Sequence, residues 1–520
     1  MRVKSVQLLA VALVVASCGP AVVTPSPSTS ASPGPSVAVT GSPESSSSPN
    51  ASPQPSTGPS ASPAPGLTGH WESAGAMAIG RGLPRAVLLG DGTVLVVGND
   101  AGGVVRPDSN RSEIWDPADG HWLSGPALDK PRAEFVALAL ADGRAFVTGG
   151  LSAGVTDSDG NQDHHQSFSS SFAFDTGKAA AGWSRVALQA RARTAPSAAA
   201  LPDGRVLVAG GYYLSGTSGF GGSGRATADA YRPGSCTLTA CPSSPADVAP
   251  PVLVPALATA ELYDPARNAW SATGNLRYAR VGAPAVTLAD GRVLVVGSAL
   301  STEVWNYTQP KISDRAYATA EVFDPRTGRF GLTGDLPAVD WTRLSKLGPY
   351  PVSPEGVTTV GTLLALSDGG ALLVGQVTSW SIRALELAGT TTRTLRFDPG
   401  TGHWTEIDQS VYASLVADQP TPVQEIVAGH VMDGASAVRM SDGRVLVAGG
   451  TGVKVTDAAG LYDPTANLWS ALPPLPTPRA DSTALLLADG SVLVVGGRGA
   501  DPLCDGCTGI TGAVRFIPGS

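Results

Sequence analysis

The sequence predicts an all-β protein, a seven-bladed β-propeller built from four-stranded antiparallel sheets. The nine residues DGRVLVAGG occur at 203–211 and again, unchanged, at 442–450. A second cassette, which joins an apolar strand to an Asp-Pro turn, follows the copies, and each end of the chain holds an incomplete copy. One four-stranded sheet cannot bury both of its faces alone, whereas a closed ring of such sheets can.

The composition of the 520-residue chain supports this fold class. Gly (63 residues) and Pro (43) are abundant and only 15% of the residues are charged, which is typical of a repeat array with many tight turns. The net charge is −8, without a long basic run. Because nucleic-acid binding needs clustered Lys and Arg to neutralise phosphates, we expect no nucleic-acid partner.

The residues before the repeats predict an export signal and a tether. Arg2 and Lys4 precede the short apolar stretch 6–15, as in a signal peptide. The sequence VASC, which ends at Cys18, resembles a bacterial lipobox. This resemblance implies a signal peptide over 1–17 and a lipid on Cys18 that anchors the protein to the outer face of the bacterial cell membrane. The alternative is an ordinary signal peptide with a chance cysteine.

Residues 18–67 are rich in Ser and Pro, and Glu44 is their only charged residue. Such a segment has too little apolar surface to fold, so it predicts a disordered tether. Residues 68–520 then form the propeller domain.

The first element of each repeat is a hairpin. An Asp-Gly pair between two apolar runs is a strong hairpin signal. We name the strand before this turn A and the strand after it B. The run after the turn, such as VLVVGG, is apolar without alternation, which indicates a strand covered on both faces. Seven aspartates open such turns: Asp91, Asp142, Asp203, Asp290, Asp368, Asp442 and Asp489.

The second element is a strand, an Asp-Pro turn and a further strand that carries an aromatic residue; we name these strands C and D. Strands A to D make one four-stranded meander. The cassette occurs at 113–122, 261–270, 321–330, 396–404 and 461–469, with a degenerate copy at 173–183.

These motifs together resemble kelch repeats. The Gly-Gly doublets, the Tyr-Asp-Pro cassette and the spaced Trp residues recur in a fixed order over residues 68–520. The resemblance implies the propeller of kelch proteins and of the central domain of galactose oxidase. It implies little about activity, because propellers host many functions.

The two ends of the chain predict how the ring closes. The last residues, AVRFIPGS at 513–520, form a strand C without a strand D, whereas TGHWES at 68–73 forms a strand D alone. We expect the N-terminal strand to complete the last blade and to remove the open edge. The alternative is that Trp71 is an isolated aromatic residue.

Strand direction separates the loops onto two faces. The A–B and C–D turns are short and define one face, which we call the short-turn face. The B–C and D–A connections define the other, the long-loop face, where functional residues are expected. It receives the long segments 151–170, 212–258, 299–317, 337–357, 408–431 and 498–512.

Arginines recur ten residues before the hairpin aspartates, at the predicted start of strand A. In one interpretation they form a cationic rim that binds a carboxylate or an acidic sugar. In the other, each Arg pairs within its own blade, for example with Glu113, Glu261 or Glu321 in strand C. The ligand-binding candidates on the long-loop face are Arg81, Arg132, Arg193, Arg280 and Arg479, together with His430.

The loop TDSDGNQDHH has the pattern of a metal site. Its oxygen ligands alternate with other residues and suit Ca²⁺, although a terminal Glu is missing and a solvated loop is the alternative. His164 and His165 could instead bind a transition metal together with His430. The candidate metal ligands are Asp157, Asp159, Asn161, Asp163, His164 and His165. Beyond this possible calcium ion we expect no cofactor.

Four cysteines remain after Cys18, an even number for an exported chain. We expect local disulfides, Cys236–Cys241 and Cys504–Cys507; a redox dithiol in CDGC and a zinc site are the alternatives. The galactose oxidase resemblance would also imply a copper site that uses Tyr crosslinked to Cys. The chain departs from that pattern, because its cysteines are assigned to disulfides and it has no Tyr-His dipeptide.

The sequence therefore predicts a monomeric, exported binding module that holds a glycan or a protein on its long-loop face. The alternative function is that of a carbohydrate-active enzyme: a hydrolase, an isomerase or a copper oxidase similar to galactose oxidase.

Overall fold

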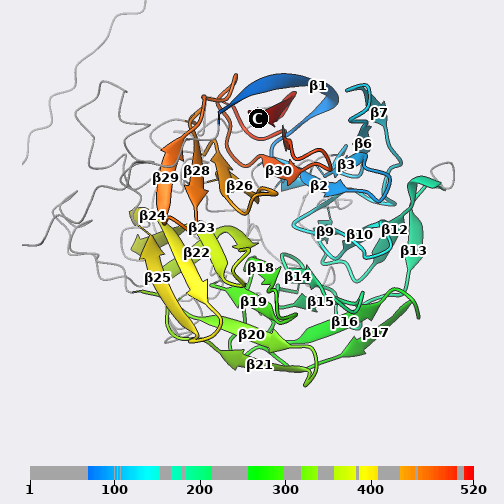
Figure 1. Cartoon of the computed structure of the whole chain (residues 1–520). Coiled ribbons are helices and arrows are strands. Elements are labelled where there is room, and N and C mark those ends of the chain that lie inside the picture. The colour runs from blue at the N-terminus through cyan, green and yellow to red at the C-terminus, as the bar shows by residue number, and fades with distance from the viewer. Residues whose placement is uncertain are drawn as a thin grey trace, which may run out of the picture. The chain divides into compact units, whose positions relative to one another are not determined.

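A computed structural model of the chain describes most of the predicted propeller domain. The described residues are 68–98, 100–101, 104–105, 107–152, 166–177, 182–213, 256–297, 318–337, 356–381, 386–407, 434–450, 455–499 and 509–519. They form seven four-stranded antiparallel sheets arranged as the blades of a ring (Figure 1). The predicted fold class is therefore confirmed.

The first four blades each use four strands of their own repeat. In the order A to D, blade one consists of β2 (Arg85–Leu88), β3 (Val94–Val97), β6 (Ser112–Trp115) and β7 (Trp122–Ser124), and blade two of β9 (Val136–Ala139), β10 (Ala145–Thr148), β12 (Ser171–Phe174) and β13 (Ser184–Val186). Blade three consists of β14 (Ser197–Ala200), β15 (Val206–Ala209), β16 (Ala260–Asp264) and β17 (Ala269–Ala272). Blade four consists of β18 (Ala285–Thr287), β19 (Val293–Val296), β20 (Ala320–Asp324) and β21 (Arg329–Leu332).

The last three blades close the ring. Blade five consists of β22 (Gly356–Ala365), β23 (Ala371–Ser381), β24 (Glu386–Asp398) and β25 (His403–Ile407). Blade six consists of β26 (Ser436–Arg439), β27 (Val445–Ala448), β28 (Ala459–Asp463) and β29 (Leu468–Ala471). Blade seven consists of β30 (Thr483–Leu486), β31 (Val492–Val495), β32 (Ile510–Pro518) and β1 (Gly69–Arg81). Two further short pairs join β4 (Asp100–Ala101) to β5 (Val104–Val105) and β8 (Arg132–Ala133) to β11 (Leu151–Ser152).

The A–B turns owe their shape to the Asp-Gly pair. Gly143 and Gly204 have φ of 84° and 87°, a conformation that glycine adopts without steric cost. The preceding Asp142 and Asp203 each accept a hydrogen bond from the backbone N–H two residues later, as Asp does in such turns. These local bonds explain why the same two residues open every hairpin.

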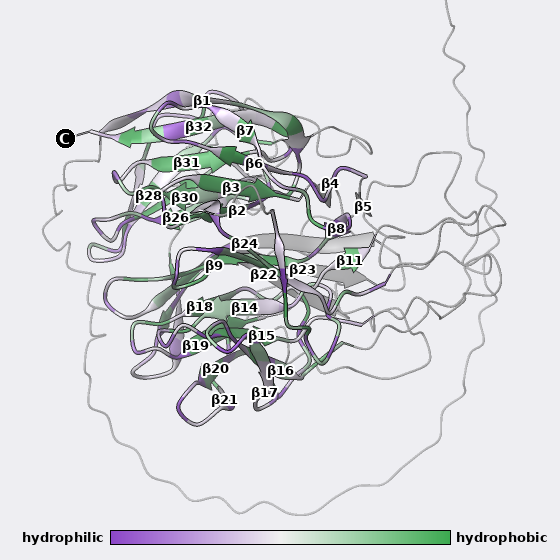
Figure 2. Cartoon of the chain, turned by 90° about the vertical axis from the view of Figure 1, so that its right-hand side faces the viewer, coloured by the Kyte–Doolittle hydropathy of each residue, from purple (hydrophilic) through white to green (hydrophobic). Residues whose placement is uncertain are grey.

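The core lies between neighbouring blades, and each strand B contributes to two interfaces. Val94 and Val96 of β3 pack with residues of blade seven, whereas Leu95 packs with residues of blade two. All four residues of β3 are fully buried, and β3 and β31 are among the apolar strands in Figure 2. The prediction that strand B is covered on both faces is confirmed.

The N-terminal strand completes blade seven as predicted. β1 pairs with β32 in antiparallel register, with Gly69 opposite Pro518 and Trp71 opposite Phe516. Trp71 donates a 2.8 Å hydrogen bond from Nε1 to the Pro473 carbonyl of blade six. Trp71 is therefore part of the blade contact and not an isolated aromatic residue. Corresponding bonds to the preceding blade are donated by Trp122, Trp183, Trp270 and Trp404.

Blade five differs from the other blades in strand length, which the sequence pattern does not predict. The pairing of β22 with β23 begins at Gly356 and Trp380, and β24 pairs with β23 from Glu386 onward. The backbone of these three strands therefore continues beyond the usual four-residue ladder at the long-loop end of the blade. The Thr-rich run at 390–392 has high β-propensity, which is consistent with this extension.

Candidate functional site

The five recurring arginines lie inside the blades. Their exposed fractions are 0% for Arg81, Arg132, Arg193 and Arg280 and 1% for Arg479. Each donates from Nη1 to the carbonyl oxygen of a glycine seventeen residues later, just after strand B. The acceptors are Gly98 (2.5 Å), Gly149 (3.0 Å), Gly210 (2.9 Å), Gly297 (2.8 Å) and Gly496 (3.2 Å).

Three of these arginines pair with a strand C glutamate of the repeat that follows them in the chain, and Arg81, the last residue of β1, thereby joins blade seven to blade one. The N–O distances are 3.0 Å for Arg81–Glu113, 2.9 Å for Arg193–Glu261 and 3.0 Å for Arg280–Glu321. The predicted pairing within the blade is therefore confirmed for Arg193 and Arg280. For them the geometry favours the structural interpretation of the arginine register over the binding rim.

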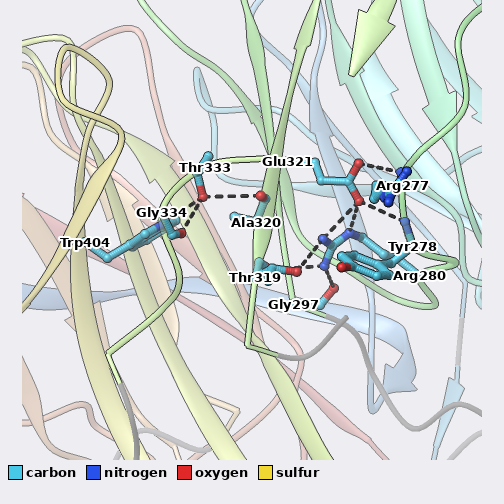
Figure 3. A network of polar contacts seen from close by, with 10 residues as sticks. All are labelled: Arg277, Tyr278, Arg280, Gly297, Thr319, Ala320, Glu321, Thr333, Gly334 and Trp404. Atoms are coloured by element: carbon cyan, nitrogen blue, oxygen red, sulfur yellow. Dashed lines mark hydrogen bonds and ion pairs between the residues drawn. The ribbon is translucent and has the colours of Figure 1, made fainter. Parts of the chain in front are cut away.

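Figure 3 shows the arrangement in blade four. Glu321 also accepts hydrogen bonds from the backbone N–H groups of Arg277 (2.6 Å) and Tyr278 (3.3 Å). Arg280 reaches the carbonyl of Thr319 as well (3.0 Å). Burial lowers the pKa of Arg280, and the Glu321 carboxylate opposes this effect. The ion pair thus joins the chain before strand A to strand C.

The other two arginines lack a strand C glutamate. Arg132 pairs with Asp129 at 2.8 Å, and its guanidinium lies 4.5 Å from the ring centroid of Phe168. Burial lowers its pKa to about 10 despite the opposing charge of Asp129. Arg479 reaches the carbonyls of Gly496 and Gly512, and burial lowers its pKa to about 10 as well.

The chain turns sharply two residues after the arginines, which places strand A later than the sequence pattern suggests. Arg193 is followed by Ala195 with a φ of 48°, and β14 begins only at Ser197. The sequence pattern placed the arginine at the start of strand A, and this left-handed residue explains the difference. The residues at this position with positive φ form what we call the inter-blade ring: Glu134, Ala195, Gly282, Gly434 and Asp481.

Hydrogen bonds connect members of the inter-blade ring in blades two to four and in blades six and seven. The N–H of Ala195 donates to the carbonyl of Glu134, and that of Gly282 to the carbonyl of Ala195, both at 2.8 Å. The N–H of Asp481 donates to Gly434 at 2.6 Å. These residues precede the innermost strands of five blades on the long-loop face (Figure 1), so they lie near that end of the propeller axis, which we call its mouth.

Two members of the inter-blade ring carry carboxylates. Glu134, with φ 52°, accepts a 2.8 Å hydrogen bond from the hydroxyl of Tyr212. Asp481, with φ 56°, pairs with Arg498. A left-handed conformation is unfavourable for a residue with a side chain and is concentrated at functional sites. The two acids therefore define the candidate site in the described part of the molecule.

The arginine register could have pointed to these acids. The same register holds Gly282 and Gly434 in other blades, and glycine adopts a left-handed turn without the steric cost that a side chain brings. Glu134 and Asp481 depart from that pattern. The conformation of the position follows from contacts between blades, so spacing alone did not identify it.

The remaining predicted site residues lie outside the described part of the chain. They are Cys18, Asp157, Asp159, Asn161, Asp163, His164, His165, Cys236, Cys241, His430, Cys504 and Cys507. The lipid anchor, the calcium loop and both disulfides therefore stay predictions. Among the described residues no group of three or more His, Cys, Asp or Glu has the arrangement of a metal site.

Three histidines are described. His121 and His403 lie at C–D turns, and His70 lies in β1, the strand that completes blade seven. His70 lies 2.9 Å from Glu72, and His121 lies 3.2 Å from Asp119, both with exposed side chains. His403 is also exposed and begins β25. They lie at the short-turn end of strand D, away from the inter-blade ring. The described chain has no helix long and apolar enough to cross a membrane.

Comparison with known proteins identifies the fold. No family model matches the sequence. A fungal alcohol oxidase of the AA5 family, solved in complex with copper, is similar over 87% of this chain and 76% of its own chain, with a TM-score of 0.50 and 17% sequence identity. This confirms the predicted likeness to the galactose oxidase type of kelch propeller, and at this identity it shows the fold alone.

Proposed function

We propose that this protein is a lipid-anchored propeller outside the cytoplasm that binds a glycan at the mouth of its axis on the long-loop face. The observation that supports this most directly is the pair of strained carboxylates in the inter-blade ring, Glu134 and Asp481. Both are next to a further polar side chain, Tyr212 and Arg498 respectively.

The chemistry of these groups fits a sugar. Carboxylates accept hydrogen bonds from pairs of hydroxyl groups, and a few well-placed polar groups on a rigid scaffold fix the orientation of a ligand. The bonds from Tyr212 and Arg498 hold each carboxylate in one position before a ligand arrives, which reduces the entropic cost of binding.

A glycan array of neutral and acidic oligosaccharides tests this proposal. We expect the wild-type protein to bind a subset of the array, and Glu134→Gln or Asp481→Asn to weaken that binding about tenfold to a hundredfold. This range corresponds to about 1.5–3 kcal/mol for a hydrogen bond to a charged group. Both substitutions keep the size of the side chain and an acceptor for Tyr212 or Arg498.

Glu72→Gln is the matched control, because Glu72 is exposed on the outer strand β1 and pairs only with His70 among the described residues. It should bind like the wild type. Equal binding by all four proteins, or no binding to any glycan on the array, would contradict the proposed site.

A glycoside hydrolase is the second candidate. Paired carboxylates are the catalytic residues of most such enzymes, and the described inter-blade ring contains two. Release of reducing ends from an array glycan by the wild type, lost in both Glu134→Gln and Asp481→Asn, would favour this function. Stable binding without cleavage favours the binding module.

A copper oxidase similar in activity to the AA5 enzyme finds little support in the described residues. None of the three described histidines lies at the inter-blade ring. A copper site at the axis would have to use His164, His165 or His430, which lie outside the described part of the chain. We derive no step through a metal.

The lipid anchor rests on the lipobox-like sequence VASC before the tether. Cys18→Ser should move the protein from the membrane fraction to the soluble fraction or leave the signal peptide uncleaved, because serine lacks the thiol that would carry the anchoring lipid. Fractionation followed by immunoblotting measures this change. Unaltered membrane association with normal cleavage would exclude lipidation of Cys18.

A further inference from the structure

Blade seven differs from the other arginine blades in the charge around its buried guanidinium. Arg81, Arg193 and Arg280 pair with a strand C glutamate, and Arg132 pairs with Asp129. No carboxylate of the described residues lies within ion-pair distance of Arg479. The strand C position is occupied by Val514, which lies opposite Val494 as Glu113 lies opposite Val96 in blade one.

The bonds that Arg479 makes to described residues all go to neutral carbonyl oxygens. Nη1 donates to the carbonyls of Gly496 (3.2 Å) and Gly512 (3.0 Å), and Nε lies 3.5 Å from the carbonyl of Thr477. Nη2, which donates to the glutamate in blades one and three, donates to no residue that the structure describes in blade seven. Burying a charge without a counter-charge is costly.

The neighbouring acid does not supply that counter-charge. Asp481 lies two residues from Arg479 but pairs with Arg498. The described part of blade seven therefore brings two arginines and one aspartate to this position, whereas blades one, three and four each bring a matched pair. The pKa of Arg479, lowered to about 10 by burial, still leaves the guanidinium charged at neutral pH.

The backbone before Arg479 offers one N–H donor fewer than the backbone before Arg81. In blade one, Glu113 accepts the N–H groups of Ala78 and Ile79, three and two residues before Arg81. The corresponding residues in blade seven are Pro476 and Thr477. Proline has no N–H group. Blade seven therefore lacks both the glutamate and one of the two N–H donors that hold the glutamate in blade one.

We infer that Arg479 binds a monovalent anion, a chloride ion or the carboxylate of a small solute, at the place where a glutamate carboxylate lies in blades one, three and four. The anion neutralises the guanidinium and so stabilises the blade that closes the ring. This inference is independent of glycan binding at the inter-blade ring.

The melting temperature of the full-length protein tests the inference. The chloride concentration is raised from about 5 mM to about 200 mM, and fluoride is lowered in step so that the ionic strength stays constant. Fluoride serves as the reference anion because its tight hydration opposes burial. We expect the wild-type melting temperature to rise by about 2–5 °C, because an anion bound only to the folded state stabilises it. Acetate in place of chloride shows whether carboxylates from solution occupy the same site.

Two variants locate the effect. Arg479→Met removes the cation and introduces the residue that blade six has at this register, Met432. Val514→Glu supplies an internal carboxylate. Both should lose the dependence on chloride. Arg439→Met, which removes an exposed arginine, is the control and should keep it.

Either variant alone decides the question if the other does not fold. An equal melting temperature of the wild type in chloride, acetate and fluoride would overturn the inference. An undiminished chloride effect in Arg479→Met or Val514→Glu would overturn it as well.

Discussion

Replacing both Arg193 and Arg280 by glutamine should lower the melting temperature by about 10 °C or more. The change leaves Glu261 and Glu321 buried without a cation, and breaking a buried pair costs about 3–5 kcal/mol each time. Two such losses are comparable to the whole free energy of unfolding of a typical protein. Calorimetry or circular dichroism of the full-length variant measures the effect.

The same blades contain a matched control. Arg205 and Arg292 follow the A–B turns, where they pair with Asp203 and Asp290 and are about 30% exposed. Because exposed ion pairs contribute about 0–1 kcal/mol, the double variant Arg205→Gln with Arg292→Gln should melt close to the wild type. An unchanged melt of the Arg193 and Arg280 variant would instead contradict the structural role of these buried pairs.

Deleting residues 68–75 should cause aggregation or a comparably large loss of stability. The deletion removes the part of β1 that pairs with β32 from Gly69 to Ser73, and with it the bond from Trp71 to blade six. Phe516, which packs against Trp71, becomes exposed along with an open strand edge. Light scattering and thermal denaturation measure both consequences.

Deletion of residues 20–60 is the control for this experiment, because it shortens only the predicted tether. We expect its melting curve to match that of the wild type. Identical curves for the two deletions would show that the ring does not depend on its N-terminal strand.

The fold could be predicted because the turns of each repeat are determined by residues within that repeat. An Asp-Gly turn requires a positive φ at the glycine and a side-chain bond from the aspartate, and both are properties of the two residues themselves. Closure by β1 followed from the strand C without a strand D at 513–520 and the single strand D at 68–73. The extension of β22, β23 and β24 was not predicted, since it interrupts no motif.

The candidate site could be predicted only in part, because it depends on contacts between blades. The spacing of the arginines from the hairpin aspartates identified their register, and the strand C cassettes identified the partners Glu113, Glu261 and Glu321. The spacing could not show that the residue two positions later turns into the left-handed region and bonds to the next blade. Glu134 and Asp481 become candidates only once that conformation is seen.

A crystal structure of the protein with the most tightly bound glycan of the array locates the glycan on the propeller. We expect sugar density at the mouth of the propeller axis, with hydroxyl groups within hydrogen-bond distance of the Glu134 and Asp481 carboxylates. Density confined to the outer strands or to the short-turn face would contradict this expectation.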